Sequence, residues 1–246
     1  MTAVQEPEVF SQRALLAPGV EAIRRYWRPF VLLQACALGL VICYFKVPRV
    51  TAACLQLAAW KEAAGLPMAA LGAVVAGAIL PEIAKALVMG EWAFGRERMR
   101  TIGFNLALFA GAGIMINAQY QAFGMLFGFD SSVATVAKKV LVDQFVTTPL
   151  YGNTYWVFLY GWRANRYRIG PTLRQVNWRW YMSRVAPLLL PGWVYWIPMV
   201  ILTFSLPTGL QFCLWLLALA AWSLIMVFLA NRPSREAETR GGELGD

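Results

Sequence analysis

Four ionisable residues lie inside long apolar stretches of this 246-residue sequence, namely Glu82, Lys85, Asp143 and Arg184. If such a stretch crosses a membrane, a charged group at its centre costs about 2.5–3.5 kcal/mol on insertion scales. Glu82 and Lys85 are three residues apart, so a helix places them on one face. Two interpretations stay open for this pair: mutual neutralisation near a helix end, or part of a water-lined pathway.

A polar stripe surrounds Asp143. Lys139 precedes it by one helical turn, Thr147 follows by one turn, and Gln144 is its neighbour. On a helix, residues four apart share a face. Pro149 follows and is expected to kink the helix, because it lacks a backbone N–H.

A second polar stripe occurs in the preceding apolar stretch. Gly113, Asn117 and Gln121 follow one another at intervals of four residues. Small residues let helices approach closely, and amides hydrogen-bond between helices. The two stripes predict a polar seam between neighbouring helices, which is either a packed contact or the wall of an aqueous pore.

The sequence contains none of the residue patterns that are typical of a catalytic site. It contains no histidine, no glycine-rich phosphate loop, and no cysteines or carboxylates at metal-ligand spacing. We therefore expect no enzyme activity, no cofactor and no metal site.

The elements that carry these residues are long apolar runs. Hydrophobic residues make up 59% of the chain and charged residues only 14%, whereas soluble domains carry about 25% charged residues. A helix crosses the hydrocarbon layer with about 20 apolar residues. The sequence predicts an all-α, polytopic integral membrane helix bundle with six spans, near residues 29–46, 67–89, 102–128, 134–161, 180–204 and 207–230.

Two further features complete the predicted architecture. Pro187, Pro191 and Pro198 predict a kinked fifth span, and residues 48–65 mix polar with apolar side chains as an amphipathic interfacial helix does. The predicted organisation is an N-terminal cytoplasmic segment (1–28), an anchor with the amphipathic helix (29–66), a transmembrane core (67–230) and a disordered tail (231–246).

Basic residues gather at the ends of the apolar runs and give a formal net charge of +9. This placement is typical of membrane topology rather than of nucleic-acid binding. With the N-terminus inside, the inner segments hold fifteen Lys and Arg residues and the outer segments five. Both termini are therefore predicted to be cytoplasmic. The first apolar run lacks a small-residue cleavage site and is interpreted as a retained anchor, with a cleaved signal as the alternative.

A set of spaced residues resembles a known family. The run Lys138-Lys139, Asp143-Gln144 and Pro149 is similar to the central signature of the Mpv-seventeen / twenty-two-kilodalton peroxisomal membrane protein family. Further matches upstream and downstream are Arg100, Gly113, Tyr120, Pro187 and Pro198. The resemblance covers about residues 60–230 and is that of a distant member. It implies a membrane protein, and some members resemble weakly selective channels.

Two functions from different classes follow. The first is a weakly selective channel or pore for ions or small metabolites, lined by the polar seam. The second is a non-transporting scaffold or lipid-interaction protein, in which Arg163–Arg179 contacts anionic headgroups. The expected partners are the lipid bilayer, anionic lipids and further copies of the chain in a homo-oligomer. The expected location is a bacterial inner membrane, with an organelle membrane as the alternative.

Overall fold

The computed structural model describes residues 12–90, 92–93, 95–207 and 209–224. Within these ranges the chain is helical and has no strand, which confirms the predicted all-α class. The elements are α1 (Gln12–Lys46), α2 (Pro48–Ala64), α3 (Leu66–Val74), η1 (Val75–Ile79), α4 (Leu80–Met89), α5 (Arg96–Phe127), α6 (Val133–Val142), η2 (Asp143–Gly152), α7 (Asn153–Ala164), α8 (Ile169–Gln175), α9 (Trp178–Trp180), η3 (Tyr181–Val185) and α10 (Ala186–Phe204), followed by the helix Gly209–Leu224. The predicted tail 231–246 lies outside these ranges, and so do the first eleven residues of the predicted segment 1–28.

Three helical stretches of the described chain are long and apolar enough to cross a membrane: Leu66–Leu87, Arg96–Phe127 and Trp178–Phe204. They coincide with three of the predicted spans. A fourth candidate is the pair Val31–Lys46 and Pro48–Ala64, whose two helices meet at a bend of 103°. The described residues therefore hold three or four candidate spans, and the predicted number of six is not confirmed.

The two remaining predicted spans have different outcomes. Residues 133–164 are helical throughout, but they do not qualify as an apolar span, because Lys138, Asp143 and Gln144 interrupt the apolar run. The helix Gly209–Leu224 is apolar but shorter than a span. The rest of that predicted span lies outside the described residues.

The stretch predicted as an amphipathic interfacial helix does form a helix, α2. At 100° per residue, its polar residues Arg49, Thr51, Gln56 and Lys61 lie on several faces. Leu55 and Trp60 are exposed, whereas Cys54 and Ala58 are buried. Its placement at a membrane surface stays a prediction.

The fifth predicted span contains two prolines inside a continuous helix. Pro191 and Pro198 lie within α10, and the helical stretch from Trp178 to Phe204 has no break. The predicted kink is therefore not confirmed. Near its start the stretch widens into the π-helical turn η3.

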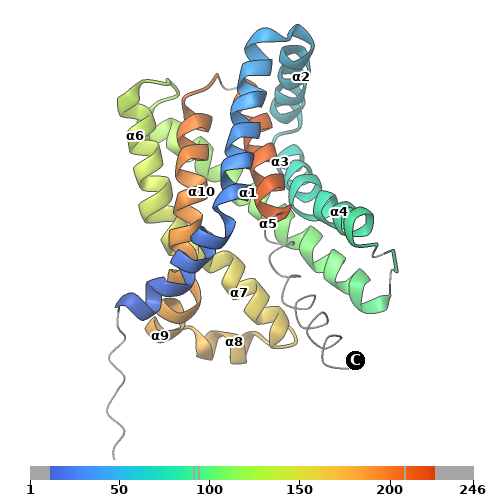
Figure 1. The fold of residues 1–246 in the computed structure, drawn as a ribbon, viewed down its shortest axis with the longest axis vertical. Coiled ribbons are helices and arrows are strands. Elements are labelled where there is room, and N and C mark those ends of the chain that lie inside the picture. The colour runs from blue at the N-terminus through green and yellow to red at the C-terminus, as the bar shows by residue number, and fades with distance from the viewer. Residues whose placement is uncertain (1–11, 91, 94, 208, 225–246) are drawn as a thin grey trace, which may run out of the picture. The chain divides into compact units, whose positions relative to one another are not determined.

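Contacts between Cα atoms divide the helices into two units. One unit comprises the described part of residues 1–31 together with 136–201, and the other comprises 32–135 together with the described part of 202–246. In the second unit, α3 and η1 pack on α5 (Figure 1). A Cβ on Gly113 would stand 2.5 Å from the carbonyl oxygen of Ala69, and one on Gly77 would meet the ring of Phe109. Close helix approach at small residues is how membrane helices gain packing energy.

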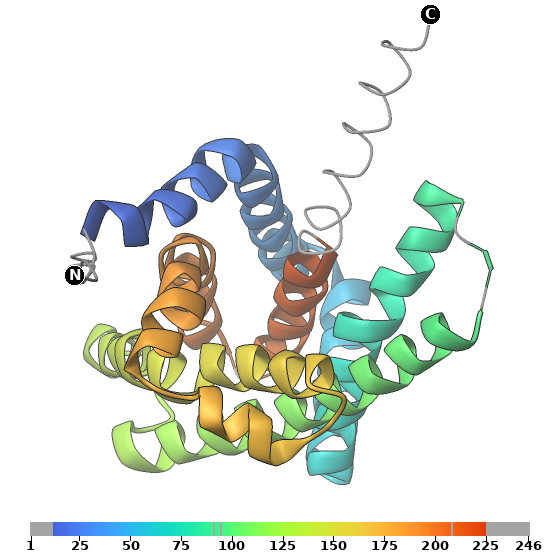
Figure 2. The ribbon, with the colours of Figure 1, turned by 90° about the horizontal axis from the view of Figure 1, so that it is seen from below.

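The first unit is arranged around η2. The π-helix contacts α7, and α7 in turn contacts η3 and α8. Figure 2 shows α8 turning back beside α7 after the short connection between them. Val185 in η3 and Tyr195 in α10 are fully buried. This unit contains Asp143, the first residue of η2.

Candidate functional site

Asp143 begins η2 and is almost completely enclosed. Its exposed fraction is 6% and that of Gln144 is 2%. The Gln144 side-chain nitrogen Nε2 donates to Asp143 Oδ2 at 2.7 Å. The Thr147 hydroxyl donates to the Asp143 carbonyl at 2.9 Å and lies 3.3 Å from Oδ1. Side chains of the same element therefore hold both carboxylate oxygens in place.

The π-helical backbone around Asp143 receives hydrogen bonds from other elements. Pro149 lies inside η2 and supplies no N–H to the helical ladder. The Trp193 indole nitrogen donates to the Gln144 carbonyl at 2.8 Å, and the Tyr181 hydroxyl donates to the Pro149 carbonyl at 3.0 Å. π-helical residues make up well under 1% of globular proteins and occur often at functional sites. Here η3 and α10 stabilise such a segment by bonding its carbonyls.

A basic residue lies one turn before the acid. Lys139 has an exposed fraction of 6%, like Asp143, whereas Lys138 is exposed. Residues four apart on a helix have Cβ atoms about 5–6 Å apart. The structure thus buries one positive and one negative side chain on neighbouring turns.

One polar atom of this cluster is left unpaired by the part of the chain that the structure describes. Gln144 Oε1 is buried and accepts no hydrogen bond from the described residues. The amide nitrogen must face the Asp143 carboxylate, since two oxygens would repel, so the unpaired end is the oxygen. An unpaired buried acceptor costs about 1–3 kcal/mol. The cluster can therefore accept one further hydrogen bond from water or a solute.

The second predicted stripe lies in the other unit. Asn117 on α5 is 9% exposed, and its Nδ2 has no partner among the described residues. Gln121, one turn later, is exposed. Tyr120 packs its ring against Phe204 with centroids 4.8 Å apart. Because Asn117 and Asp143 belong to different units, the seam between them stays a prediction.

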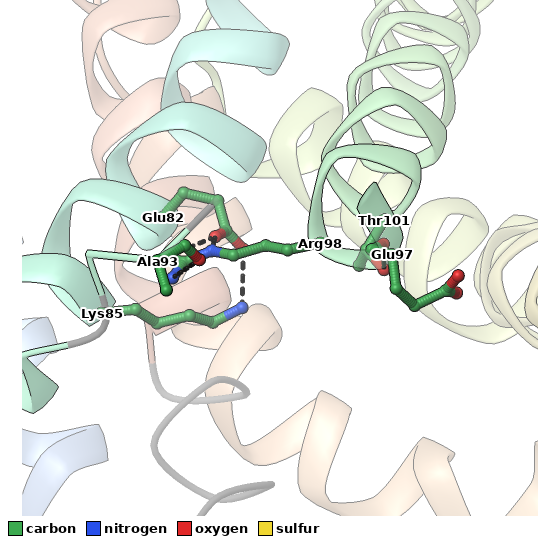
Figure 3. A network of polar contacts seen from close by, with 6 residues as sticks. All are labelled: Glu82, Lys85, Ala93, Glu97, Arg98 and Thr101. Carbon is green, nitrogen blue, oxygen red and sulfur yellow. Dashed lines mark hydrogen bonds and ion pairs between the residues drawn. The ribbon is translucent and has the colours of Figure 1, made fainter. Parts of the chain in front are cut away.

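Glu82, Lys85 and Arg98 form an ion cluster in the second unit (Figure 3). The Lys85 ammonium lies 2.6 Å from Glu82 Oε1, and Arg98 Nη2 lies 3.2 Å from Oε2. Their side chains are 13–20% exposed. The local pair expected from the spacing is present, and Arg98 from the start of α5 joins it. The cluster fixes α4 to α5 on the two sides of the connection that Gly90 and Gly95 border.

The other positions of the family-like pattern have varied surroundings. Arg100 is exposed and lies 3.5 Å from Glu97. Gly113 packs against α3, where an added Cβ would stand 2.5 Å from the Ala69 carbonyl oxygen. Pro187 lies in the first turn of α10 and Pro198 is exposed on the same helix. Arg184, the fourth ionisable candidate, is also exposed.

Sequence reasoning missed three residues of these sites. Trp193 and Tyr181 are 49 and 32 residues away from the carbonyls that they bond, and no local spacing announces such a contact. In the sequence, Arg98 is one of the fifteen basic residues assigned to the inner segments, and that assignment indicates topology only. Arginines outnumber acids in this part of the sequence. That imbalance was the available indication that Arg98 could pair with a more distant acid such as Glu82.

No group of three His, Cys, Asp or Glu side chains in the described part of the chain is placed to hold a metal ion. No family model, no curated protein and no solved structure matches this chain.

Proposed function

We propose that this chain forms a weakly selective, non-enzymatic pathway for ions or small metabolites across a membrane. The observation that carries the proposal is the buried cluster of Lys139, Asp143, Gln144 and Thr147 with its unpaired amide oxygen. The cluster would form part of the pathway wall. Asn117, whose amide nitrogen has no partner among the described residues, is a second candidate for a polar position in such a pathway.

The argument rests on the cost of polar groups in hydrocarbon. Charged side chains at membrane depth face a bundle interior or a water-filled cavity and mark ion and substrate pathways. Water in such a pathway offsets the desolvation of Asp143 and supplies a donor for Gln144 Oε1. The π-helical backbone of η2 adds support, because such segments concentrate at functional sites.

The proposal includes the finer membrane architecture. Residues 29–46, 134–161 and 207–230 would complete the three apolar helices to six spans. Both termini would be cytoplasmic, in a bacterial inner membrane or, alternatively, an organelle membrane. A distant relation to the Mpv-seventeen family is part of the same proposal, and it rests on the residue spacing alone.

The test is the current through the purified full-length protein in planar bilayers under a salt gradient. Asp143→Asn removes one charge with almost no change in shape. Asp130→Asn removes the same charge from the exposed connection between α5 and α6. If Asp143 lines the pathway, the reversal potential shifts toward less cation preference in Asp143→Asn and stays at the wild-type value in Asp130→Asn.

Two results contradict the channel. The first is the absence of current from folded wild-type protein in several lipid compositions and at several voltages. The second is an equal shift of the reversal potential in both variants, which would reflect overall charge rather than a pathway residue.

The alternative function is a non-transporting scaffold or lipid-interaction protein, alone or as a homo-oligomer. In that case the Asp143 cluster is a packed polar contact, and its neutralisation changes stability only. The exposed arginines that follow α7 favour this alternative. The absence of current from folded protein in planar bilayers would make this alternative the working hypothesis.

A further inference from the structure

We propose that residues 163–184, here called the arginine–aromatic segment, bind the phosphate groups of anionic phospholipids. The segment comprises the end of α7, α8, α9 and η3 (Figure 1). The inference holds whether or not the chain conducts ions, because it uses none of the residues of the Asp143 cluster.

The first observation is uncompensated charge. The segment contains Arg163, Arg166, Arg168, Arg174, Arg179 and Arg184, and the sequence has no Asp or Glu anywhere from residue 144 to 235. Arg166, Arg168, Arg174 and Arg179 are exposed, and none of their side chains forms a hydrogen bond or ion pair with the described residues. Guanidinium groups bind phosphate oxygens in bidentate fashion. These four arginines are therefore available to a phosphate-bearing partner.

The second observation identifies that partner as a membrane lipid. Ile169 and Leu173 are four residues apart, which places them on one face of α8, and Val176 follows directly after the last residue of that helix. Their exposed fractions are 53%, 55% and 42%, and that of Trp178 is 72%. Apolar and aromatic side chains between arginines are typical of segments that lie in the headgroup region. A lipid offers an acyl surface and a phosphate together, whereas a soluble anion offers only the charge.

The third observation is a fixed backbone. Arg166 and Tyr167 both have positive φ, 55° and 62°, a conformation that is unfavourable for residues other than glycine. Local contacts offset this cost: the Tyr167 amide donates to the Trp162 carbonyl at 2.9 Å, and the rings of these two residues are 5.1 Å apart. Asn165 Nδ2 also donates to the buried Thr172 hydroxyl at 3.1 Å.

This turn joins α7 to α8, which lie side by side in Figure 2. Arg166 and Arg168 therefore start from a defined backbone rather than from a mobile loop. A preorganised surface loses less conformational entropy when it binds. The segment thus combines charge, apolar surface and fixed geometry.

The experiment measures individual lipid binding to the full-length protein by native mass spectrometry from a neutral detergent. Phosphatidylglycerol and phosphatidylcholine are the two probes. The test variant is Arg168→Gln/Arg174→Gln/Arg179→Gln. The matched control is Lys46→Gln/Arg49→Gln/Arg96→Gln, which removes the same charge from exposed positions elsewhere. A third variant replaces Arg168, Arg174 and Arg179 by Lys and keeps the charge.

We expect wild type, the control and the lysine variant to prefer phosphatidylglycerol. The glutamine test variant should lose roughly tenfold or more of this preference, because each basic residue contributes about 1 kcal/mol at an anionic surface and 1.4 kcal/mol is tenfold. Raising the salt concentration should weaken the preference of wild type in the same direction.

The proposal is overturned if the glutamine test variant keeps the wild-type preference. It is also overturned if the control loses as much, since charge anywhere on the protein would then be enough. A wild-type protein with no salt-sensitive preference for phosphatidylglycerol overturns it without any variant.

Discussion

The ion pairs of this chain differ in burial, and we therefore expect them to contribute differently to the free energy of unfolding. The Arg98–Glu82 pair has side chains 17% and 13% exposed. Arg100 is two residues after Arg98 on α5 and pairs with Glu97, and these two side chains are 60% and 80% exposed. Exposed ion pairs contribute about 0–1 kcal/mol, because water and salt screen them. Loss of one partner of an enclosed pair leaves the other charge desolvated.

These two pairs make a residue-scale prediction. Arg98→Gln should lower the free energy of unfolding by about 1–3 kcal/mol, because Glu82 loses two charge-assisted hydrogen bonds. Arg100→Gln should change it by about 0.5 kcal/mol or less. Thermal unfolding of both variants in the same detergent measures the difference. Equal unfolding temperatures for the two variants would show that the Glu82 cluster does not hold α4 to α5.

At the scale of elements, the packing of α3 on α5 depends on a lack of side-chain volume. A Cβ on Gly113 would stand 2.5 Å from a backbone oxygen of α3 and 2.7 Å from the Ala73 methyl group. A backbone atom cannot rotate away as a flexible side chain can. Gly103, on the same helix, has no other atom within 4 Å of its Cβ position. One helix thus contains a glycine that packing requires and one that it does not.

The element-scale prediction compares these two glycines. Gly113→Ala should lower the free energy of unfolding by about 1–3 kcal/mol, since the added methyl forces the helices apart. Gly103→Ala should raise it by about 0.5–1 kcal/mol, because alanine favours an open helical position. Unfolding in a mild detergent, followed by circular dichroism, measures both. Opposite signs are expected; a harmless Gly113→Ala would contradict this packing of α3 on α5.

At the scale of the whole molecule, the distribution of basic residues defines the predicted topology. The arginine–aromatic segment and the start of α5 carry most arginines of the inner set, and Lys46 and Arg49 belong to the outer set. The bias of Lys and Arg toward cytoplasmic loops sets the orientation of membrane proteins. Lipid binding by the arginine–aromatic segment would then take place at the cytoplasmic leaflet, where anionic lipids add to the attraction.

The molecule-scale prediction concerns accessibility from outside. In a background without Cys36, Cys43, Cys54 and Cys213, an impermeant maleimide added to intact bacterial cells should label Lys46→Cys. It should leave Arg168→Cys unlabelled until the membrane is opened. Both parent side chains are exposed, so burial does not explain a failure to react. Labelling of Arg168→Cys alone in intact cells would reverse the topology.

The sequence by itself determined the helical class, three apolar helices of spanning length and the residues that are unusual in apolar surroundings. Long runs of apolar residues and spacings of three or four are local properties, so they can be recognised without knowledge of the fold. The Glu82–Lys85 contact and the placement of Lys139 and Asp143 on one helix face follow from such spacing. The number of spans was less determined, because polar residues at 138–144 make the stretch 133–164 neither clearly apolar nor clearly soluble.

Only the tertiary structure decided which partners complete these sites. The hydrogen bonds from Trp193 and Tyr181 to the carbonyls of η2 join residues far apart in the chain. Arg98 reaches Glu82 only because α4 and α5 meet across their connection. Gln121 is exposed although it shares a spacing with buried Asn117. Spacing places side chains on a face, but the packing of other helices decides which part of that face is covered.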